Sequence, residues 1–170
     1  MIWEELKESL IFIDLKADTY EEVFEKMGGE FIRQGYAKET YIDGLKEREA
    51  EFPTGIDVDG FAIAIPHTPV IHVNRTGTAI GILNKPVTFH EMGGDEEDTV
   101  EARLVIMLCV DNPSAHIDKL QKIIEMIQDK EFLGSLTKAT TEKEVTGNIL
   151  RFGKLFSRIW RSSANMMTES

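Results

Sequence analysis

His67 is the residue of this sequence best placed to carry out a reaction. It follows residues 60–65, an apolar run whose alternating small and branched side chains predict a strand packed on both faces. Pro66 ends that strand because it has no N–H to donate. Open α/β sheets bind ligands at the carboxyl ends of their strands, so the imidazole is expected to project there. Such a histidine can act as a base, a metal ligand or a nucleophile, although a lone histidine after a strand is more often structural.

Arg48 is the first possible partner of this histidine. It lies in a helix predicted over residues 39–51. It falls along the same face as Tyr41 and Leu45, on or beside the buried stripe. At the floor of a cleft, its planar guanidinium would bind an oxyanion through two N–H groups at once, which a lysine cannot do. The alternative is a side chain that covers the core with its stem and pairs with a neighbouring glutamate.

His116 is the second possible partner. An apolar run at residues 102–110 predicts a central strand, and Asn112 and Pro113 then favour a helix start, as N-cap and first helical residue. The buried stripe expected for this helix consists of Ile117, Leu120, Ile124 and Ile127. His116 lies in the first turn, where backbone N–H groups and the helix dipole favour a phosphate. The alternative is an ordinary surface residue of a first turn.

His72 and His90 complete a set of four histidines, but the spacing of the four matches no common pattern of metal ligands. A short extended segment is expected at residues 70–73, with His72 facing solvent. The acidic residues 95–98 lack the spacing of a calcium-binding loop and predict a solvated hairpin loop instead. A metal-dependent hydrolase is therefore the least favoured class of function.

The elements around these residues alternate between strand and helix patterns. Strands are expected at residues 8–14, 60–65, 77–83, 87–89 and 102–110, with a turn at 84–86. Helices are expected between 18 and 35, at 39–51, from 113, around 131–136 and after 141, and two glycines at 28–29 indicate close packing or a kink. This order predicts an α/β fold: a single three-layer domain with a mixed sheet of about five strands flanked by helices.

Composition narrows the class of protein further. The 170 residues include 19 basic and 30 acidic side chains, a net charge of −11, which argues against nonspecific binding to nucleic acid. No run approaches the roughly 20 apolar residues that span a bilayer, and the acidic start is unlike a signal peptide, so a cytoplasmic protein without stable membrane insertion is expected. The single cysteine, Cys109, is expected to be buried. The domain should end near residue 150, and residues 151–170 should form a basic amphipathic segment and a disordered tail.

Three short motifs contain the candidate residues. They are Ala-Ile-Pro-His-Thr at 64–68, Arg-Glu at 48–49 followed by Phe-Pro-Thr-Gly-Ile at 52–56, and Asn-Pro-Ser-Ala-His at 112–116. Over residues 5–150 the chain resembles the fructose/mannitol-type enzyme IIA components of the bacterial phosphoenolpyruvate-dependent sugar phosphotransferase system (PTS). The run Glu-Phe-Pro-Thr-Gly-Ile is most similar to the galactitol-specific branch.

The resemblance implies the mannitol-type enzyme IIA fold and a phosphotransferase activity. His67 would accept a phosphoryl group from the phosphohistidine of the carrier protein HPr, as a tele-phosphohistidine. It would pass the group to a sugar-specific enzyme IIB, which is coupled to a membrane enzyme IIC. Arg48 and His116 match positions that contact or stabilise the phosphoryl group, and no cofactor or metal is implied. An exposed, shallow site is expected, because two proteins must reach the same nitrogen in turn.

Two questions stay open at this point. Some mannitol-type members carry an acidic residue shortly before the active histidine, where this chain has Phe61, so the group that orients His67 is not identified. The alternative to a transport role is a regulatory domain of the same fold that is phosphorylated at His67 and signals to a regulator.

Overall fold

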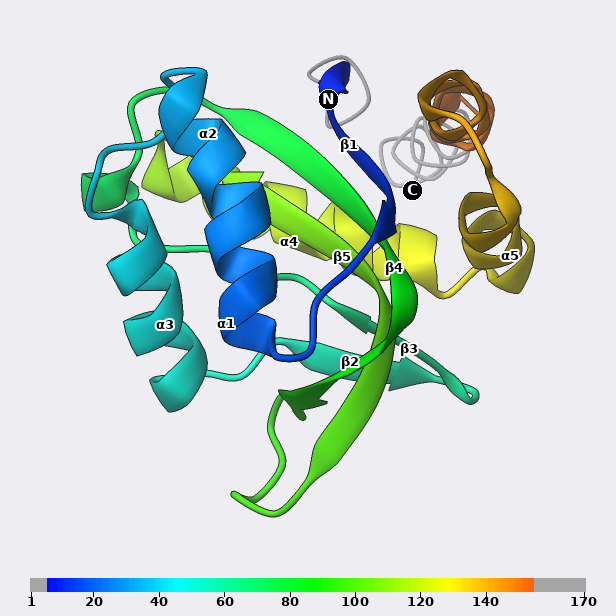
Figure 1. Cartoon of the computed structure of the whole chain (residues 1–170), viewed down its shortest axis with the longest axis horizontal. Helices are drawn as coiled ribbons and strands as arrows, with labels where there is room; N and C mark the ends of the chain where they lie inside the picture. Colours follow the sequence, from blue (N-terminus) through cyan, green and yellow to red (C-terminus); the bar gives the residue numbers. More distant parts are fainter. Residues whose placement is uncertain (1–5, 155–170) are drawn as a thin grey trace, which may run out of the picture.

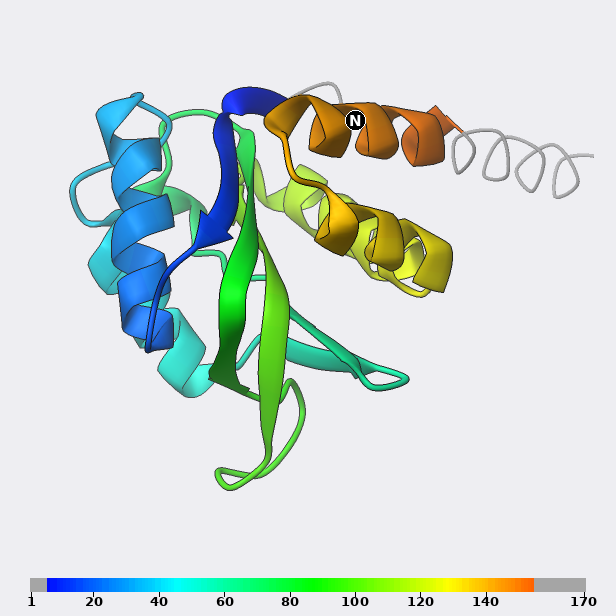
Figure 2. The same cartoon turned by 45° about the vertical axis from the view of Figure 1, so that its right-hand side comes forward.

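A computed structural model describes residues 6–154, which form a mixed five-stranded sheet with helices on both faces (Figures 1 and 2). The strands are β1 (Leu6–Leu15), β2 (Gly55–Val58), β3 (Phe61–Ala64), β4 (Gly77–His90) and β5 (Thr99–Cys109). Their order is β1-β4-β5-β3-β2. The pairs β1–β4 and β3–β5 are parallel, and the pairs β4–β5 and β2–β3 are antiparallel. The predicted α/β class and three-layer architecture are confirmed.

The first helical layer covers one face of the sheet. It consists of α1 (Tyr20–Val23), the π-helical turn η2 (Phe24–Gly28), α2 (Gly29–Arg33) and α3 (Tyr41–Glu51). Thr19 is the N-cap of α1, since its hydroxyl accepts a hydrogen bond from the N–H of Glu22. A Cβ at Gly28 would lie 3.2 Å from Ile42 of α3, so this glycine allows the two helical segments to approach closely.

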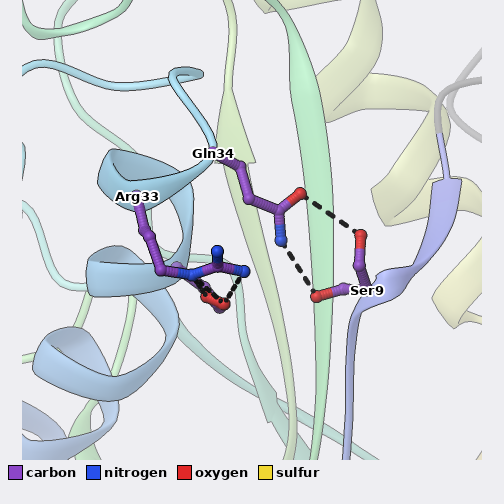
Figure 3. Close-up of polar contacts among 4 residues, drawn as sticks. Ser9, Arg33 and Gln34 are labelled. Atoms are coloured by element: carbon purple, nitrogen blue, oxygen red, sulfur yellow. Dashed lines mark hydrogen bonds and ion pairs between the residues drawn. The ribbon is translucent and has the colours of Figure 1, made fainter.

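The end of α2 is tied to the edge strand β1 by a pair of hydrogen bonds (Figure 3). The Ser9 hydroxyl donates to the Gln34 side-chain oxygen at 3.2 Å, and the Gln34 amide donates back to the Ser9 carbonyl at 3.3 Å. Arg33 pairs with Glu30 on the exposed side of the helix. The first helical layer is thereby fixed at the edge of the sheet.

The second helical layer lies on the opposite face. It consists of α4 (Pro113–Ile127), α5 (Lys130–Lys138) and helical residues 142–154. Phe152 packs on Phe132 of α5, with ring centroids 5.2 Å apart, so the helix continues past the expected domain end. The rest of the predicted basic segment, residues 155–170, lies outside the described residues. None of the helices within 6–154 has the length and apolarity that a bilayer crossing requires.

The stripe predicted for α4 is confirmed at Ile127 and at the partly buried Leu120, and it is wrong at Ile117 and Ile124. Ile123, Met126 and Ile127 are buried, whereas Ile117 is 73% exposed and Ile124 also faces solvent. Consecutive isoleucines at 123 and 124 allow two overlapping apolar stripes, and packing on the sheet selects the one that includes Ile123. An exposed isoleucine therefore stands directly after His116.

The turn predicted at residues 84–86 is also wrong, because β4 runs through it as one strand. The pairing of β1 with β4 ends at Leu15 and Leu83, so Pro86 lies where β4 has lost that neighbour and a missing N–H costs little. On the other side of β4 the register against β5 shifts between Ile82 and Val87. The proline is accommodated by an edge and a bulge rather than by a turn.

Candidate functional site

The chain carries His67 to the carboxyl end of the central strand β5. Pro66 does not end the pairing abruptly: its carbonyl accepts a hydrogen bond from the N–H of Leu108 at 3.0 Å, and His67 forms a parallel bridge with Leu108. The ring is only 5% exposed. The expectation of an imidazole projecting into an open, shallow site is therefore wrong, because the extra pairing holds the residue against the sheet.

Hydrogen bonding fixes which nitrogen of His67 is available for reaction. Nδ1 lies 2.9 Å from the carbonyl oxygen of Ile65. Since a carbonyl only accepts, Nδ1 must donate and carries the proton of the neutral ring. Nε2 has no hydrogen-bond partner among the described residues and keeps its lone pair. Burial is the main reason that the pKa of His67 is lowered to about 4, so the ring is neutral at physiological pH.

The structure brings the three candidate residues together. The rings of His67 and His116 meet edge to face, with centroids 4.7 Å apart and an interplanar angle of 87°. Burial lowers the pKa of His116, and the positive charge of Arg48 lowers the pKa of both histidines further. The guanidinium of Arg48 stacks on Phe52, 4.3 Å from the ring centroid. A neutral nucleophilic nitrogen thus lies beside one permanent cation and one titratable ring.

The start of α4 has the predicted capping. Asn112 is the N-cap, and its side-chain oxygen accepts from the N–H of Ser114 at 2.9 Å. The N–H of His116 donates to the Asn112 carbonyl at 3.1 Å. Two of the amides expected to receive a phosphate are therefore already used within the chain. Arg48 is the stronger candidate for holding an oxyanion here.

The other histidines do not join this group. Nδ1 of His72 lies 2.8 Å from the Thr40 hydroxyl, and the expected extended segment is instead the 3-10 helix η3 (Val70–His72). His72 is half-buried against α3, so the prediction that it faces solvent is wrong. His90 lies against Tyr20. Within residues 6–154, no three or more His, Cys, Asp or Glu side chains gather in a group that could hold a metal ion.

Sequence reasoning missed the role of Glu49. Its carboxylate is 2% exposed and accepts hydrogen bonds from the N–H and the hydroxyl of Thr54. Burial raises the pKa of Glu49 to about 7, although Thr54 and the charge of Arg48 act in the opposite direction. The signal was the spacing, since Glu49 follows Tyr41 and Leu45 at four-residue intervals on the buried face of α3.

Burial of His67 predicts a pH dependence of stability with a definite sign. The pKa is about 4 in the folded protein against 6.5 ordinarily. Between these values the His67 side chain binds more protons in the unfolded chain, so its contribution to the free energy of unfolding rises with pH, whereas the raised pKa of Glu49 acts in the opposite direction. The contribution, on the order of 3 kcal/mol, is complete above pH 6.5 and is lost as the pH falls toward 4. Denaturant unfolding of wild type and His67→Gln across this range checks it, and a difference between the two that does not vary with pH contradicts it.

Comparison with known proteins gives a consistent result. The family model described as "Phosphoenolpyruvate-dependent sugar phosphotransferase system, EIIA 2" matches residues 4–151. The PTS system galactitol-specific EIIA component of Escherichia coli (strain K12) is 35% identical over 115 residues, which cover 68% of this chain and 75% of that protein. The mannitol-specific EIICBA component of the same strain is 31% identical over 138 residues, covering 79% of this chain and 20% of that longer protein.

One solved structure is similar to this chain in both fold and sequence. It is the complex of enzyme IIAMTL with phosphorylated enzyme IIBMTL from Escherichia coli, determined by NMR. The TM-score is 0.70 at 28% identity, and the match covers 85% of this chain and 96% of that one. Both sequence and fold therefore relate this chain to sugar-specific enzyme IIA components.

Proposed function

Because this chain belongs to the EIIA 2 family of the phosphoenolpyruvate-dependent sugar phosphotransferase system, we propose that it carries a phosphoryl group on His67 from phospho-HPr to a sugar-specific enzyme IIB. Family membership supports a phosphocarrier with phosphotransferase activity. One observation about the site carries the proposal further. Nε2 of His67 is a neutral, unpaired nitrogen beside Arg48 and His116. The proposed place of action is the cytoplasm, with galactitol-like sugars as the class served.

In the proposed reaction the phosphoryl group passes in line between two imidazoles, once the docked partner has uncovered Nε2 of His67. The lone pair of Nε2 attacks the phosphorus of the donor's phosphohistidine, and the bond from phosphorus to the donor nitrogen breaks with its electron pair left on that nitrogen. His67 becomes positively charged on forming the new bond, and its Nδ1–H remains donated to the Ile65 carbonyl, which stabilises that charge. Transfer of the group to enzyme IIB reverses the same steps toward a new acceptor. Such transfer needs mainly alignment and positive charge around the phosphoryl oxygens.

Arg48 and His116 supply that charge in the proposed mechanism. The guanidinium of Arg48 carries a positive charge and can bind two phosphoryl oxygens at once. His116 is neutral before transfer, because burial and Arg48 lower its pKa. A phosphoryl dianion next to it acts in the opposite direction and favours its protonation. Since Nε2 is covered in the free protein, we expect the docked partner to displace the half-exposed ring of His116 slightly.

Exposed apolar side chains lie close in the sequence to the three site residues and suit a docking face for both partners. Phe52 stacks on Arg48, Ile71 lies in η3 shortly after His67, and Ile117 follows His116. All three are at least half exposed. Large apolar side chains in such positions commonly anchor protein–protein contacts.

Replacing Ile117 with aspartate should therefore weaken transfer from HPr. We expect kcat/KM for phosphorylation by phospho-HPr to fall at least about tenfold, mainly through KM, because an apolar anchor is lost and a charge is introduced. The fold should survive, since the side chain of Ile117 is 73% exposed and packs in no core cluster of the described residues. Ile124→Asp is the matched control, two turns further along the same helix. Equal losses in the two variants would rule out a docking role for Ile117.

The direct test is reconstitution with purified components. Incubation with labelled phosphoenolpyruvate, enzyme I and HPr should give one acid-labile phosphoryl group per chain. Addition of a galactitol-type enzyme IIB should then remove the label. Failure of labelling contradicts the proposal. A label that forms but is not passed to any enzyme IIB favours the regulatory alternative.

A further inference from the structure

We propose that Glu49 is a positioning residue for His67, acting through Thr54 and Ile65. The inference rests on the proposed function, since it concerns how the phosphoryl acceptor is held. The carbonyl of Ile65 orients the imidazole of His67 by accepting from Nδ1. The buried carboxylate of Glu49 holds in place the segment that contains Ile65.

An unbroken chain of hydrogen bonds connects the two residues. The Glu49 carboxylate accepts from the N–H of Thr54 at 2.8 Å and from its hydroxyl at 2.9 Å. The carbonyl of Thr54 accepts from the N–H of Ile65 at 3.3 Å. The carbonyl of Ile65 accepts from Nδ1 of His67 at 2.9 Å. The series of hydrogen bonds runs from the end of α3, through Thr54 just before β2, to the residues that follow β3, so the carboxylate fixes the end of α3 relative to the end of β3.

The hydrogen bonds between Glu49 and Thr54 lie in the protein interior. Glu49 is 2% exposed and Thr54 is also buried, so water does not replace a lost bond cheaply. A buried carboxylate costs more than an amide of the same shape, and packing alone does not require it. Above a pH of about 7 the ionised carboxylate offers one acceptor oxygen to the N–H of Thr54 and the other to its hydroxyl.

The hydrogen bonds between Glu49 and Thr54 also determine the position of the Arg48 guanidinium. Arg48 precedes Glu49 in α3, and the helix ends at Glu51, just before the loop that contains Thr54. A shift of this helix end would move the guanidinium relative to His67. Glu49 therefore influences both the tautomer of the acceptor ring and the distance of the positive charge from it, without touching the phosphoryl group itself.

The test compares Glu49→Gln with Glu51→Gln, an exposed neighbour at the end of the same helix. In Glu49→Gln we expect kcat for phosphorylation by phospho-HPr to fall about tenfold with KM within about twofold, because two of the three docking side chains, Ile71 and Ile117, lie on other elements. The ¹⁵N shifts of His67 should show a smaller share of the Nδ1–H tautomer. Glu51→Gln should match wild type in both measurements.

A second pair of variants keeps the inference testable if Glu49→Gln is unstable. Thr54→Val should reproduce the change in the His67 tautomer, and Thr54→Ser, which keeps the hydroxyl, should restore it. The double variant Glu49→Gln with Thr54→Val should lower kcat no more than either single variant does, since both substitutions break the same series of hydrogen bonds. Wild-type tautomer and kcat in Glu49→Gln would overturn the inference. The tautomer of His67 is measured without phosphoryl transfer, so it tests positioning by Glu49 even if the protein accepts no phosphoryl group from HPr.

Discussion

Replacement of His67 with glutamine should abolish phosphorylation of the chain. The variant keeps a side chain of similar reach that can donate to the Ile65 carbonyl, but it has no nucleophilic ring nitrogen. Because the proposed chemistry is covalent, we expect the rate of labelling from phospho-HPr to fall by at least about 10⁴-fold, to the background of the assay. The measurement is the initial rate of label incorporation at equal concentrations of folded protein.

His72→Gln and His90→Gln serve as matched controls for this result. His72 is bonded to Thr40 and His90 lies beside Tyr20, so neither reaches the acceptor nitrogen. Both variants should be labelled at close to the wild-type rate. Labelling of His67→Gln at a comparable rate would show that another residue accepts the phosphoryl group.

Replacement of Arg48 with alanine should have the second largest effect. Loss of an oriented cation at developing negative charge typically costs about 10²–10³-fold in rate, so kcat should fall by that factor while some labelling remains. Arg48→Lys should lie between wild type and alanine, because it keeps the charge without the two-pronged geometry. The fold should be retained, since the stacking of Arg48 on Phe52 is worth only about 0.5–1 kcal/mol.

The same variant has a second, independent consequence for the histidines. The charge of Arg48 helps to lower the pKa of both His67 and His116, so both values should rise in Arg48→Ala. An NMR titration of the imidazoles checks this without any phosphoryl donor. Arg33→Ala, which removes an exposed arginine paired with Glu30, should leave rate and titration unchanged. An equal loss of rate in both arginine variants would remove Arg48 from the mechanism.

The candidate site was largely predictable because its residues follow strong local signals. Asn112 and Pro113 mark a helix start unambiguously, and this start places His116 beside the strand end that carries His67. The burial of His67 was not predictable, since it depends on pairing with Leu108 about 40 residues away in the chain. Glu49 was missed for a different reason: its four-residue spacing from Tyr41 and Leu45 places it on the buried face of α3, and this local signal was overlooked.

One error in the fold came from a pattern that tertiary context decided, and a second came from a local signal that was overlooked. An Asn-Lys-Pro sequence at residues 84–86 is typical of a turn, yet the strand continues there because one of its edges is free. The hairpin between β2 and β3 was overlooked although Asp59 and Gly60 carry its signal. Both residues have positive φ, 51° and 88°, as a two-residue turn of this kind requires.

The central claim is that Nε2 of His67 is the phosphoryl acceptor, because Nδ1 is committed to the Ile65 carbonyl. NMR of the phosphorylated protein with ¹⁵N-labelled histidine tests this claim most directly. We predict phosphorus coupled to Nε2 of His67, with the Nδ1 proton retained. Phosphorus on Nδ1, or on any residue other than His67, would contradict the account.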